Sequence, residues 1–341
     1  YPGREFDFIN ASMTSVNSHV LSEVVPEVVS LRPDVAVIYM GNNEVVGPYG
    51  PGTPFTAWTR SRFFIWLDKK LRGTKTYQLL DHVIGRLLPP PPKKWEGFQM
   101  FSDLRVSEDS PALEGVYDAF RRNLEGMVGL LLDGGSKVVL CTVAVNLADW
   151  GPTGRTSLPP DSAASQLLAQ GRGLLDEGQH EKASEVLDQA RATAPENAEI
   201  AFYLGRALQN AGRMSEARDA FSRARDLDEH RFRADSRING IIRDVARLFA
   251  DRGVVLVDAE RDLAEGGLTS RNEFTEHVHL TFEGMSRLVA LTAEAITPLL
   301  PELGPPRPAR GDLGAELRQR IFYTPFDEVL LAVVAREVGD M

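Results

Sequence analysis

The sequence is poor in cysteine, in metal-ligand patterns and in long apolar runs. Its single cysteine, Cys141, cannot form a disulfide bond within the chain. Its six histidines and one cysteine show no spacing typical of a zinc site, so we expect neither a metal ion nor another cofactor. No apolar run approaches the roughly 20 residues that cross a bilayer, and no signal-peptide pattern is visible.

Basic residues are fewer than acidic ones. Lys and Arg number 38 against 48 Asp and Glu, which gives a net charge of −10. An acidic chain of this kind is a poor general binder of nucleic acid, so we expect no nucleic-acid partner. We interpret the chain as a soluble domain and leave its compartment open. It begins with Tyr1, and an earlier segment that anchors or exports the full-length protein stays an alternative.

Short apolar segments alternate with amphipathic ones along much of the chain, which is typical of an α/β domain with a parallel sheet. Buried strands are predicted, from runs such as KVVLCTVAV and GVVLVDA, at 6–10, 34–40, 137–145 and 253–259. Helices are predicted at 20–32, 110–133, 234–250 and 284–299, with a further helical pattern over 54–87 that includes an aromatic and basic cluster at 60–72.

The middle of the chain repeats itself at an interval of 34 residues. The pairs are Gly171 with Gly205, Gly178 with Gly212, Ala183 with Ala217, Leu187 with Phe221 and Ala190 with Ala224. This pattern resembles the tetratricopeptide repeat, whose small residues let two antiparallel helices approach closely. We predict four helices over 160–228, with the helix over 234–250 as a third packing partner, and we expect a protein or peptide partner at the repeats.

The repeats are predicted to interrupt the α/β domain as an all-α insertion. The expected divisions are the first α/β part at 1–158, the insertion at 159–232, the second α/β part at 233–300, and a Pro-rich linker with a last helix (326–338) at 301–341.

Two predicted strands deliver polar residues to their carboxyl ends, where ligands bind in open α/β sheets. The strand over 34–40 is followed by Gly41 and Asn43, and EHVHL follows the last strand with Glu276 three residues before His279. An acid at that spacing can fix the tautomer of an imidazole and support it when it takes up a proton. The side-chain N–H of Asn43 can stabilise an oxyanion.

These motifs resemble those of the SGNH/GDSL hydrolases. GNNE is similar to the family's Gly-x-Asn-Asp motif, with Glu44 for Asp, and EHVH is similar to its Asp-x-x-His motif, with Glu276 for Asp. INASMT stands at the family's oxyanion glycine, so the resemblance assigns that backbone N–H to Ser12. It implies a flavodoxin-like α/β/α sandwich with a parallel sheet. In it, His279 is the general base, Glu276 orients it, and Asn43, Ser12 and Gly41 form the oxyanion site.

The nucleophile is where the sequence departs from this family. A Gly-Asp-Ser motif follows the family's first strand, and no Gly-Asp-Ser occurs here. The resemblance therefore implies that the first strand and the nucleophilic Ser lie before Tyr1, with Ser12 as the one rival. On this interpretation the chain belongs to a serine esterase or acyl-transfer domain. Its substrate would be a small acylated molecule, either a carbohydrate ester or a lipid ester.

Several polar residues near the predicted strand ends have two interpretations. Asn42, Glu44, Asn146 and Asp149 are candidates either for lining the cleft or for turn and capping roles. His277 is an alternative partner of Glu276.

The segment FRADSRIN, over 232–239, is interpreted as a capping and ion-pair segment, with substrate contact as the alternative. The chain as a whole also has an alternative. At Ser12, Glu44 and Glu276 the sequence differs from the family's motifs. These differences fit a scaffold that has lost catalytic activity and binds a protein or peptide partner through its repeats.

Overall fold

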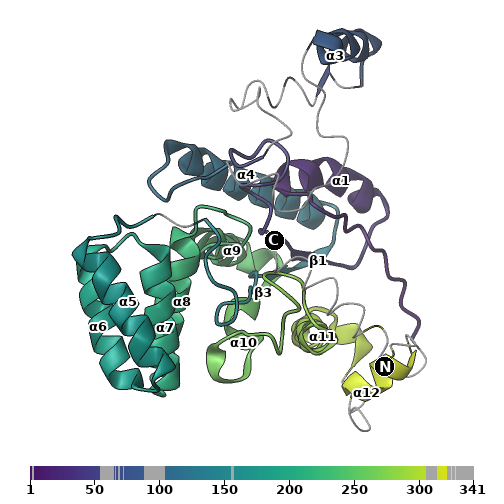
Figure 1. Cartoon of the computed structure of the whole chain (residues 1–341). Helices are drawn as coiled ribbons and strands as arrows, with labels where there is room; N and C mark the ends of the chain where they lie inside the picture. The colour runs from purple at the N-terminus through teal and green to yellow at the C-terminus, as the bar shows by residue number, and fades with distance from the viewer. Residues whose placement is uncertain are drawn as a thin grey trace.

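The computed structural model describes residues 4–53, 73–87, 104–154, 157–304 and 313–320, together with residues 1, 65, 67, 70, 71, 324 and 327. The predicted helix over 326–338 and most of the aromatic and basic cluster over 60–72 lie outside the described residues. Figure 1 shows a helical slab, α5 to α8, beside a second body that contains the sheet.

Three parallel strands form the described sheet, in the order β1 (Val35–Tyr39), β2 (Lys137–Cys141) and β3 (Val254–Val257). β2 pairs with both neighbours along its length. The predicted strand over 137–145 is too long, because the backbone N–H and C=O of Val143 bond to the side chain of Asn239 instead of a neighbouring strand. The strand predicted over 34–40 is confirmed, and the one predicted over 253–259 is present but ends at Val257, before a short helix begins at Ala259.

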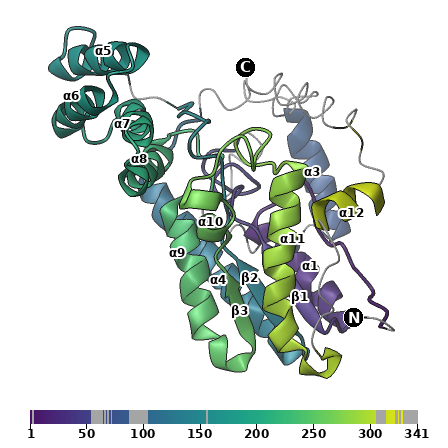
Figure 2. The same cartoon turned by 90° about the horizontal axis from the view of Figure 1, so that it is seen from below.

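Helices cover both faces of this sheet, as Figure 2 shows. Val138 and Leu140 of β2 belong to a core shared with α1 (Ser18–Ser30), α4 (Pro111–Asp133) and α9 (Ser236–Leu248). Val139 and Cys141 face the other way, into a core with Leu288 of α11 (Phe282–Ile296). This alternation follows from the two-residue period of a strand, and the four helices agree with those predicted.

The remaining described helices are α3 (Lys75–Leu87), α5 (Ala163–Asp176), α6 (His180–Thr193), α7 (Ala198–Asn210), α8 (Met214–Leu227), α10 (Ala259–Asp262) and α12 (Leu313–Arg320). Short 3-10 turns are η2 (Ala250–Arg252), η3 (Glu265–Gly267), η4 (Thr297–Leu299) and η5 (Pro301–Leu303). None of the described helices has both the length and the apolar character needed to cross a membrane.

The strand predicted over 6–10 is wrong. The segment makes no strand pairing with the described residues, and Phe8 is 93% exposed. Apolar composition favours an extended backbone, but a strand also needs a neighbour for its N–H and C=O groups. Within the described sheet β1 pairs only with β2, so its other side is an edge, and Val37 on it is 47% exposed.

The four helices predicted for the insertion are present as two hairpins, α5 with α6 and α7 with α8. A Cβ on Gly171 would stand 2.5 Å from the Leu187 side chain, and one on Gly205 would stand 2.7 Å from the Phe221 ring. The two hairpins therefore use the same contact, one repeat apart: a missing Cβ admits the large side chain of the facing helix.

The predicted role of α9 as a third packing partner of the repeats is wrong. Its apolar face, which includes Ile238, Ile242 and Val245, is buried in the core that α4 and the sheet share. The helix therefore serves the α/β body. The contacts between the repeats and that body include polar groups at the end of α8, among them Arg225, which bonds to Glu260 of α10 and to Ser236 at the start of α9.

Candidate functional site

The carboxyl ends of β1, β2 and β3 lie at one edge of the sheet, because the strands are parallel. The loops after these strands carry all the residues predicted for the site except Ser12. Contacts between the loops and the start of α9 hold this edge together.

The loop after β1 is fixed to α9. Gly41 has a φ of +153°, and a Cβ there would stand 2.8 Å from the side chain of Ile238. Both the conformation and the close approach favour glycine. The side-chain oxygen of Asn42 accepts a hydrogen bond from the backbone N–H of Ala234, at 2.9 Å. Gly41 and Asn42 thus set where this loop leaves the sheet.

Asn43 and Glu44 follow in the same loop and face the start of α1. The amide of Asn43 is half-buried and donates to the carbonyl oxygen of Val16, at 3.1 Å. Glu44 is buried and accepts from the backbone N–H and the hydroxyl of Ser18, at 2.8 and 2.7 Å. Burial raises the pKa of Glu44 to about 7, against the lowering effect of Ser18. This geometry matches the capping alternative for Glu44.

Ser12 lies on an exposed stretch of chain. Its backbone N–H and its hydroxyl both donate to the side-chain oxygen of Asn10, at 2.9 and 2.6 Å. The N–H was a candidate oxyanion donor and the hydroxyl a rival nucleophile. Both groups are instead hydrogen-bonded to Asn10. The structure does not bring Ser12 into contact with Asn43 or His279.

Glu276 and His279 form the hydrogen bond that their spacing predicts. Nδ1 of His279 lies 2.7 Å from Oε1 of Glu276, and the backbone N–H of His279 donates to the same oxygen at 2.6 Å. Burial favours a higher pKa for Glu276, but hydrogen bonds from His277 and His279 outweigh it and hold the pKa well below its usual range. The bond to Glu276 in turn raises the pKa of His279.

The two members of this pair differ in exposure. The side chain of Glu276 is 6% exposed, and that of His279 is 81% exposed. Within the described part of the chain, Nε2 of His279 makes no hydrogen bond. An imidazole held through Nδ1 by a buried carboxylate, with Nε2 open to solvent, can accept and return a proton at the surface.

His277 occupies the other side of Glu276. Its Nδ1 lies against Oε2 of Glu276, and its ring contacts the tilted ring of Trp150 and, edge-on, that of Phe232, at centroid distances of 5.2 and 5.9 Å. Burial lowers the pKa of His277, and the Arg233 charge acts in the same direction, against the pull of Glu276. Glu276 therefore touches both imidazoles that the sequence offered as partners: an enclosed one that favours the neutral form, and an exposed one.

Asn146 ties the loop after β2 to the Glu276–His279 loop. Its backbone N–H donates to the carbonyl of His277 at 3.0 Å, and its side-chain amide donates to the carbonyl of Glu276 at 3.1 Å. Its side-chain oxygen accepts from the N–H of Asp149 at 3.0 Å. Asn146 is 3% exposed, so it acts as a link between two loops. Asp149 pairs with Arg271, at 3.2 Å.

The sequence did not single out Trp150, and it offered Arg233 only as a member of the segment over 232–239. Arg233 is buried, and it donates to the carbonyls of Asn146 and Trp150 at 3.0 and 2.9 Å. The capping and ion-pair interpretation of its segment is confirmed, since Asp235 accepts from the N–H of Ile238 at the start of α9. No local pattern marks Trp150, because its role depends on a contact with a distant imidazole.

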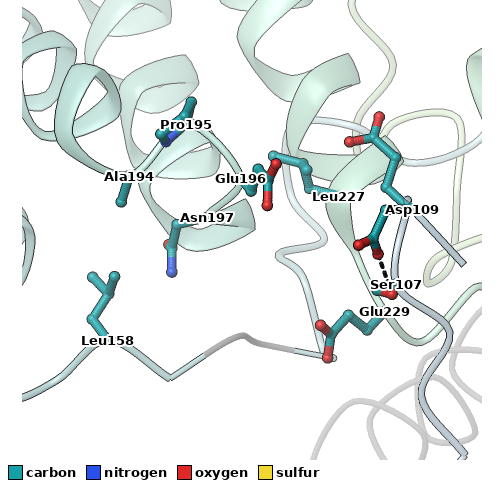
Figure 3. A pocket seen from close by; sticks show the side chains of 10 residues that line it. Ser107, Asp109, Leu158, Ala194, Pro195, Glu196, Asn197, Leu227 and Glu229 are labelled. Atoms are coloured by element: carbon teal, nitrogen blue, oxygen red, sulfur yellow. Dashed lines mark hydrogen bonds between the residues drawn. The ribbon is translucent and has the colours of Figure 1, made fainter.

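A separate hollow lies where the repeats meet the α/β body. It has a volume of about 360 Å³ and is lined by Ser107, Glu108, Asp109, Leu158, Ala194, Pro195, Glu196, Asn197, Leu227 and Glu229. Figure 3 shows Leu158 and Ala194 on one side of it and Asp109 and Glu229 on the other. The hollow therefore combines an aliphatic wall with four carboxylates.

Comparison with known proteins identifies one part of the chain. Residues 168–231 match the family model of the tetratricopeptide repeat. The match confirms the predicted repeats, and we call α5 to α8 the tetratricopeptide region. Such repeats generally bind proteins or peptides. No curated protein and no solved structure matches the chain.

Among the described residues no group of three or more His, Cys, Asp or Glu side chains could hold a metal ion.

Proposed function

We propose that the α/β body is an ester hydrolase or acyl-transfer domain of the SGNH/GDSL type. The observation that carries this proposal is the bond of 2.7 Å between His279 and the buried Glu276, with the imidazole exposed at the carboxyl edge of a parallel sheet. Helices on both faces of the sheet support the flavodoxin-like arrangement that the resemblance implies.

In this proposal His279 is the general base. A serine hydroxyl attacks the acyl carbonyl and gives its proton to Nε2, while Glu276 holds the Nδ1 proton and stabilises the imidazolium. The imidazolium then protonates the departing alcohol, and an acyl-serine ester remains. Water, or a second alcohol in acyl transfer, attacks that ester with His279 again as base and releases the serine.

The other groups have narrower roles in the proposal. Asn43 donates one amide N–H to Val16, and its second N–H is the donor for the oxyanion. The nucleophile is the serine that the resemblance places after the family's first strand, and the hydroxyl of its one rival, Ser12, is bonded to Asn10. The substrate is a small carbohydrate or lipid ester, and no cofactor takes part.

The pH dependence of hydrolysis tests the role of Glu276. We expect hydrolysis of a short-chain ester by the full-length gene product to rise with pH through a titration above 6.5, because the base must be neutral and the bond to Glu276 raises the pKa of His279 above 6.5. Glu276→Gln should move the midpoint down toward 6.5 and lower the plateau.

Glu273→Gln is the matched control, since Glu273 lies in the same loop but bonds to the N–H of Ser270. It should leave the midpoint in place. A midpoint that Glu276→Gln leaves unchanged would contradict the assignment.

A second function is favoured by the tetratricopeptide match itself. We propose that this region binds a protein partner through an extended segment that carries a Lys or Arg side chain. The hollow between the repeats and the α/β body supports this chemistry, because its aliphatic wall suits the stem of a long basic side chain. Glu108 and Glu229 already pair with Arg223 and Arg105, so Asp109 and Glu196 are the carboxylates that suit the charged head. This binding function does not depend on whether the α/β body has catalytic activity.

Peptide binding measured by fluorescence anisotropy tests this second function. We expect peptides that contain Lys or Arg to bind more tightly than the same peptides with Glu at those positions. Glu196→Lys, in the lining of the hollow, should weaken binding at least tenfold, which is about 1.4 kcal/mol. Glu185→Lys, an exposed change outside that lining, should have little effect. Equal loss in the two variants, or tighter binding of acidic peptides, would rule out the hollow as the site.

A further inference from the structure

Arg233 joins the end of the last repeat to a loop that is far away in the sequence. Its side chain is 5% exposed, and its guanidinium donates to the carbonyls of Asn146 and Trp150 in the loop after β2. The same guanidinium forms an ion pair of 3.3 Å with Asp228, the residue that follows α8. The described structure thus places one buried cation between the last repeat and a loop at the sheet edge.

The loop that Arg233 holds in turn supports the Glu276–His279 pair. Asn146 donates to the backbone carbonyls of Glu276 and His277. It therefore fixes two consecutive residues just before His279. Trp150 stacks on the ring of His277, which itself lies against the carboxylate of Glu276. Arg233 therefore reaches the pair by two routes, through Asn146 and through Trp150.

The end of the tetratricopeptide region supplies the other half of this support. Asp228 is 3% exposed and accepts from the backbone N–H groups of Thr153 and Gly154, in addition to its ion pair with Arg233. Phe232, one residue before Arg233, packs edge-on against the ring of His277. The chain that leaves the repeats thus helps to enclose the imidazole of His277.

A guanidinium suits this place better than an ammonium does. Its planar fork donates in two directions at once, here to two carbonyls through Nη1 and to a carboxylate through Nη2. Removing it leaves buried carbonyls without their donor and Asp228 without its cation, and such groups move or admit water to regain a partner.

We propose that Arg233 is a positioning residue for the Glu276–His279 pair and that Asp228 makes the tetratricopeptide region part of the support of that site. This inference rests on the proposed hydrolase function only where it says that the positioned His279 acts as a base. The contacts that hold Glu276 and His279 are properties of the fold.

NMR titration of the imidazoles in the 341-residue protein tests the proposal without an activity assay. In Arg233→Lys, which keeps the charge, we expect the pKa of His279 to fall toward 6.5, because the bond to Glu276 loosens. Arg233→Met should do the same. Arg243→Met is the control: Arg243 pairs with Asp258 and Glu260, away from Asn146 and Trp150, and its loss should leave His279 unchanged.

A folded Arg233→Lys protein with an unchanged His279 titration would overturn the proposal. A second measurement needs no variant. In the wild type the amides of Asn146, Val278 and His279 should exchange with solvent as one unit, within about tenfold of each other. Widely different exchange rates for these amides would show that the loops move independently and would also overturn it.

These outcomes are separable from the fate of the hydrolase function. If Arg233→Lys shifts the His279 titration while His279→Ala leaves ester hydrolysis intact, the positioning role stands and the hydrolase function fails. If His279→Ala abolishes hydrolysis while Arg233→Lys changes neither the titration nor the pH profile, the hydrolase stands and the positioning role fails.

Discussion

Replacement of His279 by alanine is expected to lower kcat/KM for ester hydrolysis by about 10⁴-fold or more in the full-length gene product. The reason is that the serine hydroxyl then has no base, and in characterised serine hydrolases the loss of one member of the triad costs this much or more. Glu276→Ala should cost nearly as much, because the imidazole loses the carboxylate that holds its Nδ1. Steady-state kinetics with a short-chain acyl ester measure both.

His180→Ala is the control for these variants. His180 begins α6 in the tetratricopeptide region, away from the loop that carries Glu276 and His279, so its loss should leave kcat/KM nearly unchanged. Circular dichroism should show that all three variants are folded. A His279→Ala protein that keeps more than about a tenth of the wild-type kcat/KM would contradict the role of His279 as base.

Replacement of Arg225 by methionine is expected to lower the free energy of unfolding by about 3–5 kcal/mol, the cost of breaking a buried ion pair from one side. The side chain of Arg225 is 0% exposed and donates to Asp226, Glu260 and Ser236. Methionine has a similar stem but leaves Asp226 without this cation and leaves Glu260 with Arg243 alone. Urea denaturation followed by circular dichroism measures the loss.

Arg213→Met is the matched control within the same repeats. Arg213 is 41% exposed and pairs with the exposed Glu216, so its loss should change the free energy of unfolding far less than the loss of Arg225. Because Arg225 joins α8 to α10 and α9, we also expect a single unfolding transition in the wild type. A separate early transition of the tetratricopeptide region, or equal effects of the two substitutions, would contradict the idea that buried ion pairs fix the repeats to the α/β body.

The repeats were predictable because their packing rule is local and recurs. The Gly205–Phe221 contact repeats the Gly171–Leu187 contact 34 residues earlier, so a missing Cβ and a large side chain leave a periodic trace in the sequence. The bond between Glu276 and His279 was predictable for a similar reason: the two residues are three positions apart, and one turn of chain brings them together.

The errors share a different cause, which is dependence on a partner that the local sequence does not name. The apolar residues over 6–10 favour an extended chain, but a strand forms only where another strand takes its hydrogen bonds. Helix α9 shows a clear apolar stripe, but the stripe alone does not say whether α4 or α8 receives it. The early end of β2 likewise depends on Asn239, which lies far along the chain.

The support around the candidate site was also beyond the sequence. Arg233 bonds to the backbone carbonyls of Asn146 and Trp150, and a carbonyl is present at every residue, so no side-chain pattern marks the acceptor. The composition of the segment over 232–239 did indicate capping and ion pairs, and Asp235 and Arg233 have those roles. The connection from that segment to the Glu276–His279 loop required the fold.

Covalent labelling by a fluorophosphonate, a probe that reacts with activated serines, tests the hydrolase proposal most directly. The measurement is the labelled fraction of the full-length gene product, with the modified serine located by mass spectrometry, in the wild type and in His279→Ala. We predict one labelled serine, other than Ser12, and loss of the label in His279→Ala, because a serine reacts quickly only when a base takes its proton. A label on Ser12, a label that persists in His279→Ala, or no label in the wild type would contradict the account.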